Sequence, residues 1–234
     1  DPRMQVLGTY ALTWENGVDR LKTVLAEDHH APEPLSETEE ASLTGPEDDQ
    51  ISGYMAADVP DWLWPSFEKA FGAAACAEGK ALASRAPIDM RVNSLKSDCD
   101  KMLKRLARAG LAPTAITPTA IRIAPKPGAA RMPHVQAEEG YRKGWFELQD
   151  EASQIAAALA GAKPGNQVLD LCAGGGGKTL ALAAAMENKG QIYAYDADRM
   201  RLAPIHERLQ RSGVRNVQVR DPASSSLDDL KGNL

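Results

Sequence analysis

The sequence contains only three cysteines, and these are widely separated, at Cys76, Cys99 and Cys172. Their spacing fits neither a zinc site nor a disulfide framework, which indicates a reducing compartment. The chain also lacks an apolar run of about 18 residues, so no transmembrane helix is expected. Its first residues lack the basic start and apolar centre of a signal peptide. We therefore expect a cytoplasmic protein that contacts neither a membrane nor a metal ion.

Charge of one sign is missing from long stretches of the chain. Residues 23–68 contain no Lys or Arg, whereas residues 80–131 carry eleven basic residues and only three acidic ones, a net charge of +8. Such a concentrated positive field attracts a polyphosphate backbone, because each neutralised phosphate releases counterions. The alternative is an ordinary solvated helix face, which the Lys101, Lys104 and Arg105 spacing alone would favour. Charge by itself leaves nucleic-acid contact and solvation as open alternatives.

Residues 1–79 read as a helical segment with an acidic linker. The apolar spacing predicts a helix over residues 4–26, which Gly17 can break; the residues that set this spacing are Val6, Tyr10, Trp14, Leu21 and Leu25. Residues 28–50 are acidic and nearly free of large apolar groups, which predicts a linker or long loop. After Pro60, aromatic residues between Trp62 and Phe71 predict a short amphipathic helix whose aromatic cluster belongs to a core.

Residues 80–149 have the pattern of a small α+β module. Apolar residues alternate over 88–92 and again over 121–123, and Trp145 to Leu148 end the module; each of these three stretches predicts a strand. Between the first two, Asp98 is placed to cap a helix that stops at Gly110. Most of the basic residues lie in this module.

Residues 150–234 alternate between helix and strand patterns. Strands are predicted at 168–171, 192–195 and 217–219, and helices at 152–159, 179–186 and 200–209. This alternation is typical of parallel β-α-β units in a doubly wound sheet. The continuous apolar run of the first strand predicts burial on both faces. Because an open sheet of this class has about five to seven strands, the chain is expected to stop partway through the domain.

Four consecutive glycines follow the first of these strands, in LDLCAGGGGKTLAL, residues 169–182. A phosphate-binding P-loop would need its first glycine where Cys172 stands. A dinucleotide-binding pattern would need its third glycine where Thr179 stands. The pattern that fits is Asp-x-x-x-Gly-x-Gly, with Asp170, Gly174 and Gly176, in which the glycines let the chain approach a ligand closely.

Acidic residues end the next two strands. Asp196 follows the second strand, where a carboxylate can accept the hydroxyls of a ribose, and Asp221 follows the third, where it can accept an adenine amine. With Asp170, this places acids at three consecutive strand ends. Carboxylates would repel a triphosphate, so they favour S-adenosylmethionine as the cofactor. Two alternatives remain, a P-loop nucleotide hydrolase and a non-catalytic RNA-binding module.

Residues 144–184 resemble the RsmB/Sun-type RNA cytosine C5-methyltransferase family, whose hallmark reads QDEAS, then PG, then VLDLCAAPGGKT. The chain matches it at Gln149–Ser153, at Pro164 and Gly165, and from Asp170 to Ala173, whereas Gly174 and Gly175 replace Ala-Pro. PIDMRVNSLK, residues 87–96, resembles the "RVN" strand in the family's RNA-binding module. The resemblance covers roughly residues 80–234.

The resemblance implies an α/β fold, with part of a Rossmann-like class I methyltransferase sheet preceded by an α+β RNA-binding module. It implies methyl transfer from S-adenosylmethionine to carbon 5 of cytosine in RNA, with ribosomal RNA as the expected substrate. The residues implied to bind the cofactor are Cys172, Ala173, Gly174, Gly175, Gly176, Gly177, Lys178, Asp196 and Asp221. Among them, Lys178 is expected to pair with the cofactor carboxylate, and Cys172 to be a small filler beneath the loop rather than a nucleophile.

The family's chemistry depends on two further cysteines, in Pro-Cys and Thr-Cys pairs, of which one adds to carbon 6 of the base. Neither pair occurs in the sequence. We therefore assign no catalytic residue, and expect this chain by itself to bind cofactor weakly or not at all and to catalyse nothing.

Overall fold

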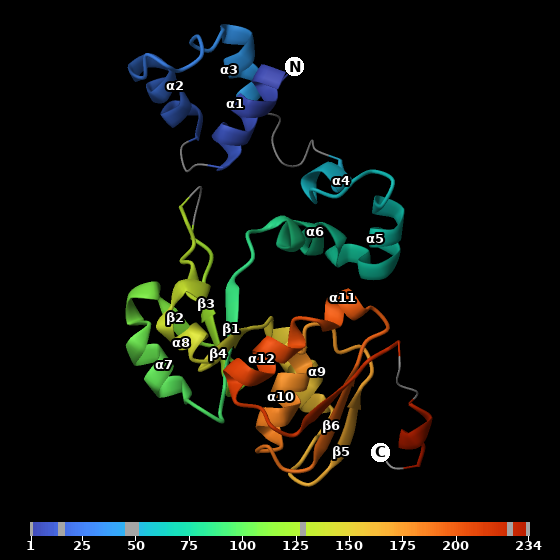
Figure 1. Ribbon diagram of the computed structural model, residues 1–234. Helices are drawn as coiled ribbons and strands as arrows, with labels where there is room; N and C mark the ends of the chain where they lie inside the picture. Colours follow the sequence, from blue (N-terminus) through green and yellow to red (C-terminus); the bar gives the residue numbers. More distant parts are fainter. Residues whose placement is uncertain (1, 14–16, 45–51, 127–129, 224–226, 233–234) are drawn as a thin grey trace. The chain divides into compact units, whose positions relative to one another are not determined.

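The structure is a computed structural model that describes residues 2–13, 17–44, 52–126, 130–223 and 227–232 (Figure 1). It forms two compact units, one of Asp1–Ala86 with Pro125–Met132 and one of Pro87–Ala124 with Pro133–Leu234. The boundaries expected at residues 79/80 and 149/150 stay predictions. Within the described ranges, no helix has both the length and the apolar character needed to span a membrane.

The first unit is helical. Its helices are α1 (Pro2–Thr13), α2 (Gly17–Glu27), α3 (Glu37–Leu43), α4 (Gly53–Ala56), α5 (Trp64–Phe71) and α6 (Ala75–Ala83). The helix predicted over residues 4–26 is divided into α1 and α2. A Cβ atom at Gly17 would lie 1.7 Å from the Ala11 carbonyl oxygen, so only glycine lets α2 begin this close to α1. Trp14, which contributed to the predicted spacing, lies outside the described residues.

Part of the predicted acidic linker is a helix, so that prediction is wrong for residues 37–43. Ser36 and Glu39 form a capping box, in which each side chain accepts the other residue's backbone N–H. Arg3 then pairs with Glu39 at 2.7 Å, which ties α3 to α1. The Ser-x-x-Glu capping signal is present in the sequence, but the acidic composition of residues 28–50 favoured the prediction of a linker. Residues 45–51 of the predicted linker lie outside the described residues.

The aromatic helix forms as α5, but its prediction as core is wrong. The helix contains no buried residue, and both Trp62, just before it, and Phe71, at its end, are exposed. Phe67 stacks on Phe71 with ring centroids 4.8 Å apart. This aromatic stripe is therefore largely a surface feature of the first unit.

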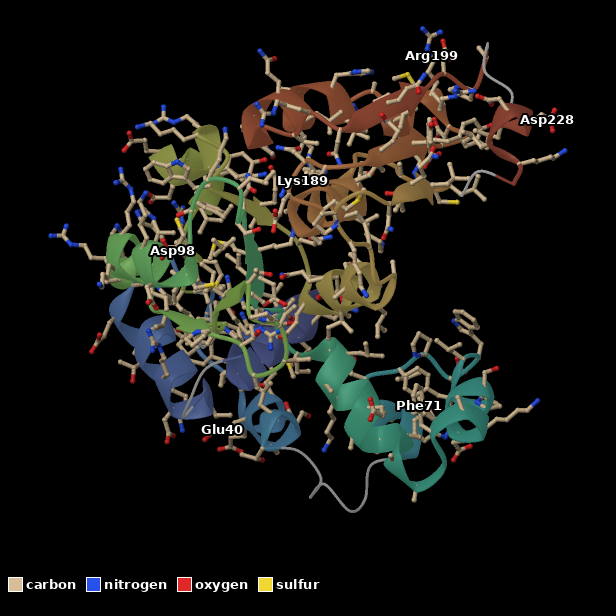
Figure 2. All side chains as sticks on the ribbon, turned by 90° about the horizontal axis from the view of Figure 1, so that it is seen from below. Glu40, Phe71, Asp98, Lys189, Arg199 and Asp228 are labelled. Carbon is tan, nitrogen blue, oxygen red and sulfur yellow. The ribbon has the colours of Figure 1, made fainter. Side chains whose placement is uncertain are left out.

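The second unit contains an antiparallel sheet of order β2-β3-β1-β4. Its strands are β1 (Ile88–Val92), β2 (Leu111–Pro113), β3 (Ala120–Ile123) and β4 (Phe146–Leu148), with helices α7 (Cys99–Arg105), α8 (Glu139–Arg142) and a 3-10 turn (Ala107–Ala109). Asp98, labelled in Figure 2, caps α7 by accepting the Lys101 N–H at 2.8 Å. The helix was predicted to stop at Gly110. The α-helix ends earlier, at Arg105, and a 3-10 turn leads from it to Gly110, which has a left-handed conformation. Strand β2 was not predicted, because three residues ending in proline carry no alternating pattern.

Strand β1 is buried on both faces, including its polar residues. Asp89 is 7% exposed and accepts two hydrogen bonds from the Arg122 guanidinium, at 2.5 and 2.7 Å. The Arg122 hydrogen bonds hold the pKa of the Asp89 carboxyl below its usual range, against the effect of burial. Arg91 is 5% exposed and donates to Gln149 at 2.7 Å, and burial lowers the pKa of its guanidinium to about 10.

A parallel sheet of order β5-β6-β7 follows, as the alternating pattern predicts. Its elements are α9 (Glu151–Leu159), β5 (Gln167–Asp170), α10 (Gly177–Ala185), β6 (Gln191–Tyr195), α11 (Arg199–Leu202), α12 (Ile205–Ser212) and β7 (Val217–Arg220). The helix predicted over 200–209 is divided at Pro204, which has no N–H to continue α11. The burial predicted for the first strand on both faces is wrong: β5 is half-buried, and Leu171 after it is 53% exposed.

The core of this region lies on one face of the parallel sheet. Ile192 and Ala194 project from that face of β6 and are fully buried. Leu182 and Met186 of α10 pack around Ile192, while Ile205 of α12 packs with Ala194. Figure 1 accordingly shows α10 and α12 on the same side of β5 and β6. This packing holds the loop between β5 and α10 against the start of α12.

Candidate functional site

Three aspartates lie at the carboxyl ends of the three parallel strands. Asp170 is the last residue of β5, Asp196 follows β6 and Asp221 follows β7. Parallel strands present these ends at one edge of the sheet, which is where open α/β sheets bind ligands. The structure therefore places the predicted acids at the edge where the sequence put them.

Asp196 is bound directly to the glycine loop, the segment Cys172–Gly177. The residue is 4% exposed; its Oδ2 accepts the Gly174 N–H at 2.8 Å and its Oδ1 accepts the Asp198 N–H at 2.9 Å. The N–H groups of Asp198 and Gly174, helped by the positive charge of Arg201, hold the pKa of the Asp196 carboxyl below its usual range although burial opposes them. The carboxylate is therefore ionised at neutral pH, and each of its oxygens retains a lone pair.

The other two aspartates have different partners. Asp170 Oδ2 accepts the Thr179 hydroxyl at 2.7 Å, which joins the end of β5 to the first turn of α10. Asp221 Oδ1 accepts the Ala223 N–H at 3.0 Å and lines a hollow of about 320 Å³. That hollow is lined by residues of α11, α12 and the end of β7, among them the exposed Arg199, which is labelled in Figure 2. The structure thus joins Asp196 to the glycine loop, while Asp221 lines a hollow to which no loop glycine contributes.

The glycines of the loop serve two separate purposes. Gly174 has a φ of +50°, and a Cβ there would meet nothing closer than Arg201 Nη2 at 3.8 Å and Asp196 Oδ2 at 3.9 Å. Gly176 has a φ of +82°, and a Cβ there would lie 2.5 Å from Ile205 Cγ1. A Cβ atom at Gly174 would therefore meet its neighbours at ordinary contact distances, whereas Gly176 lacks a side chain because α12 packs there.

One of the predicted loop residues, Cys172, is placed differently from its expected role. Cys172 is exposed, so the prediction that it fills space beneath the loop is wrong. Ala173, the next residue, is 8% exposed and packs against Ala194, Leu202 and Ile205, and it supplies the filling that Cys172 does not. Lys178 is exposed in the first turn of α10.

Sequence reasoning missed a side chain that holds the loop. Arg208 of α12 donates through Nη1 to the Gly175 carbonyl at 2.6 Å and through Nη2 to Glu147 of β4 at 3.0 Å. The signal that could have found it is the spacing of Ile205, Arg208 and Ser212, which puts an arginine between two buried residues on one helix face. Glu147, an acid in the middle of a short apolar strand, was the matching signal.

Comparison with known proteins bears on two successive stretches of the chain. The sequence profile described as "16S rRNA methyltransferase RsmB/F" matches residues 156–233, which contain the glycine loop and all three aspartates. The profile described as "Methyltr_RsmF/B-like, ferredoxin-like domain" matches residues 59–128. Two parts of one family thus occur in order along the chain. The chain belongs to the RsmB/F methyltransferase family.

Curated relatives agree with this assignment. The "Probable ribosomal RNA small subunit methyltransferase B" of Synechocystis is 33% identical over 68% of this chain and 35% of its own length. The "Ribosomal RNA small subunit methyltransferase B" of Pseudomonas syringae is 34% identical over 66% of this chain and 34% of its own length. The chain therefore spans about a third of the length of these relatives.

Solved structures agree on the fold. A methyltransferase homolog protein from Pyrococcus horikoshii is 26% identical, with a TM-score of 0.64 over 81% of this chain and 60% of its own. NSun6 from the same organism, solved with SFG, is 21% identical, with a TM-score of 0.60 over 74% of this chain and 67% of its own. The fold is α/β and Rossmann-like, preceded by a ferredoxin-like domain and a helical part, as expected. The comparisons do not favour the P-loop hydrolase.

Some of the basic residues of the family's ferredoxin-like domain are buried or paired. Arg91 is buried and Arg122 pairs with Asp89, so neither of these contributes fully to the surface charge. One exposed group lies on α7 and the turn after it, and consists of Lys101, Lys104, Arg105 and Arg108; the basic residues exposed elsewhere in the matched range are Lys69, Lys80, Arg85, Lys96 and Lys126. The α7 surface therefore carries part of the positive charge that the sequence predicts.

Trp145 lies at the centre of this basic surface. Lys101, Arg105 and Lys143 approach its ring to 5.0, 4.7 and 5.3 Å from the centroid. Each distance is within cation–π range. Glu139 pairs with Arg105 and with Lys143, which offsets part of their charge. The ring and the cations around it still combine positive charge with the flat face that nucleic acids contact.

Asp196 gives the fold a pH dependence that can be measured. Its pKa is lowered from 3.8 in the folded state, so its stabilising effect is complete above about pH 4 and is lost as pH falls further. Asp196→Asn offers one acceptor and one donor to two N–H groups, so we expect a lower melting temperature at pH 7. We also expect a shallower loss of stability between about pH 4 and 2 than in the wild type. Melting curves across this range test it, and parallel curves for the two proteins would contradict it.

Proposed function

We propose that the parent protein of this chain transfers a methyl group from S-adenosylmethionine to carbon 5 of cytosine in ribosomal RNA, and that this chain by itself catalyses nothing. The observation that carries the proposal is the ionised Asp196, bonded to the N–H of Gly174, a glycine of positive φ in the loop after β5. Membership of a 16S rRNA methyltransferase family supports the same reaction.

The residues at the strand ends fit this cofactor. The cofactor carries a ribose diol, an adenine amine and a positive sulfonium, and carboxylates suit all three groups. We propose that Asp196 accepts the ribose hydroxyls, that Asp221 accepts the adenine amine and that Lys178 pairs with the cofactor carboxylate. The full proposed set of cofactor-binding residues is Cys172, Ala173, Gly174, Gly175, Gly176, Gly177, Lys178, Asp196 and Asp221.

The cofactor, when bound, supplies an electrophilic methyl group. The proposed role of this chain's own residues is to bind and orient the cofactor. No Pro-Cys or Thr-Cys pair occurs in the 234 residues. The nucleophile that the family uses on carbon 6 of cytosine is therefore not assigned here. The target base has to leave its stack to reach such a site.

We propose RNA as the partner and the α7 surface as its contact. The support is the group of exposed cations around Trp145, of which Lys101 and Arg105 lie within the residues that match the family's ferredoxin-like domain. Phosphates of the RNA would neutralise this surface, so binding should weaken as salt rises. A ribosomal RNA substrate is consistent with a cytoplasmic location, which we propose as well.

Of the two expectations for this chain, weak binding and no binding, the strand-end residues favour weak binding. A titration of the chain with S-adenosylhomocysteine, followed by heteronuclear NMR, tests the cofactor assignment, because NMR detects weak binding. We expect shifts of the amides of residues 173–177 and 196–198. Gly174→Ala should weaken binding by about tenfold, because its methyl group would occupy the space beside Asp196. Gly161→Ala is the control: Gly161 also has a positive φ, at +64°, and open space around it, but it lies outside the site.

Three results would contradict the proposal. ATP could shift the loop amides where S-adenosylhomocysteine does not, which would favour the hydrolase. RNA could bind while neither ligand shifts any amide, which would favour a non-catalytic module. Gly174→Ala and Gly161→Ala could weaken binding equally, which would separate binding from the glycine loop.

A further inference from the structure

We propose that Arg208 and Glu147 are positioning residues, through which the ferredoxin-like part holds the glycine loop in its cofactor-binding conformation. The inference rests on the proposed function in taking this loop as the cofactor site. Its structural half, that this pair orders the loop, stands on contacts in the second unit alone.

The first step is the contact between α12 and the loop. Ile205, in the first turn of α12, is fully buried and occupies the space that a side chain at Gly176 would need. Arg208 lies three residues further along the same face and donates to the Gly175 carbonyl at 2.6 Å. The helix therefore contacts two successive loop residues, one through packing and one through a hydrogen bond.

The second step is the anchor of Arg208. Glu147 of β4 is 2% exposed and accepts from Arg208 at 3.0 Å, from Arg211 at 2.6 Å and from the Ser212 hydroxyl at 3.2 Å. Its strand is paired to β1, with Glu147 opposite Arg91. Because Glu147 is buried, accepts from three side chains and lies on a paired strand, its position is fixed. The Arg208 guanidinium is therefore held between Glu147 and the Gly175 carbonyl.

The third step is the other end of α12. Lys96 donates to the Arg211 carbonyl at 2.6 Å, and Asn93 donates to the Ser212 carbonyl at 2.9 Å. Both donors follow β1 in the antiparallel sheet. The last carbonyls of α12 are thus bound by that sheet, and the helix cannot shift relative to it without breaking these bonds.

The consequence falls on a loop that needs an external constraint. Four consecutive glycines have more backbone freedom than any other run, and ordering them costs binding free energy. The Arg208 bond fixes the Gly175–Gly176 peptide, next to the N–H of Gly174 that Asp196 binds. Arg208 belongs to α12 and not to the loop, so its proposed effect on cofactor binding acts through the conformation of the loop.

Arg211 is a matched control for Arg208. Both arginines pair with Glu147, and both lie on α12, but only Arg208 also bonds the loop among the described contacts. Arg208→Met and Arg211→Met each remove one ion pair to the same carboxylate. A purely structural role predicts similar effects of the two changes on the loop and on ligand binding.

The experiment measures amide hydrogen exchange at Gly174–Gly177 in the free chain and the Kd for S-adenosylhomocysteine by NMR titration. For Arg208→Met we expect exchange at Gly176 to rise by about tenfold and the Kd to rise by about tenfold, as for one lost hydrogen bond to a charged group. For Arg211→Met we expect both values within about twofold of the wild type. Arg208→Lys, which can reach one acceptor at a time, should recover part of the loss and also serves if Arg208→Met does not fold.

The proposal is overturned if Arg208→Met leaves loop exchange at the wild-type rate, or if both methionine variants change it equally. Absence of ligand shifts in the wild type would refute the proposed function for this chain. In that case the exchange comparison still decides whether Arg208 orders the loop. The two failures are therefore distinguishable.

Discussion

Gly144→Ala is expected to lower the free energy of unfolding by about 4 kcal/mol, through left-handed strain and a backbone clash together. Gly144 has a φ of +69°, and a Cβ there would lie 2.0 Å from the Arg211 carbonyl oxygen. That oxygen belongs to the end of α12, which Lys96 also binds, so it cannot move aside cheaply. Urea unfolding followed by circular dichroism measures the loss.

Gly110→Ala is the control for this change. Gly110 has nearly the same φ, +71°, but nothing lies within 4 Å of the position a Cβ would take. It should therefore show the strain alone, about 1 kcal/mol. Equal losses in the two variants would show that the approach of Gly144 to α12 has no energetic weight.

Glu147→Ala is expected to cost about 3 to 5 kcal/mol, because it leaves partly buried cations without their acceptor. Arg208 and Arg211 both pair with this carboxylate, and their side chains are only 23% and 11% exposed. Burial acts to lower the pKa of the Arg211 guanidinium, and the hydrogen bond and charge of Glu147 raise it overall, so the variant removes this support. A guanidinium stays protonated in proteins, so both charges persist in the variant. Thermal and urea unfolding should both detect the change.

Glu139 provides the matched comparison for Glu147. It also pairs with two cations, Arg105 and Lys143, but its side chain is 45% exposed and lies on the surface. Solvent screens such pairs, so Glu139→Ala should change the unfolding midpoint little. A loss as large as that of Glu147→Ala would contradict the role assigned to burial.

Local patterns in the sequence predicted most of the strands and helices of the second unit. Period-two runs found β1 and β3, the alternation of strand and helix patterns found β5, β6 and β7, and Asp98 marked the start of α7, because each signal lies within a few residues. Errors arose where a local rule competed with another one. Pro204 divides a helix that periodicity alone extends over it, and Ser36 with Glu39 starts a helix inside an acidic stretch.

The candidate site was predictable to the same extent and for the same reason. The distance along the chain from Gly174 to Asp196 follows from β-α-β geometry, and the two residues are joined by a hydrogen bond. Arg208 could not be found in this way, because its partner Glu147 is 61 positions distant, in another sheet. A strand pattern also does not show whether the Cys172 side chain, which is exposed, lies beneath the loop or on its surface.

The bond between Asn93 and Ser212 has a consequence for synthesis of the polypeptide. The two residues are 119 positions apart, so the asparagine leaves the ribosome long before the carbonyl that its amide group binds. At the ribosome's pace of about 5 to 20 residues per second, that interval lasts several seconds or more. The nascent antiparallel sheet meanwhile exposes Glu147 without its arginines. The antiparallel sheet can therefore complete its packing only after α12, the helix that precedes β7, has been translated.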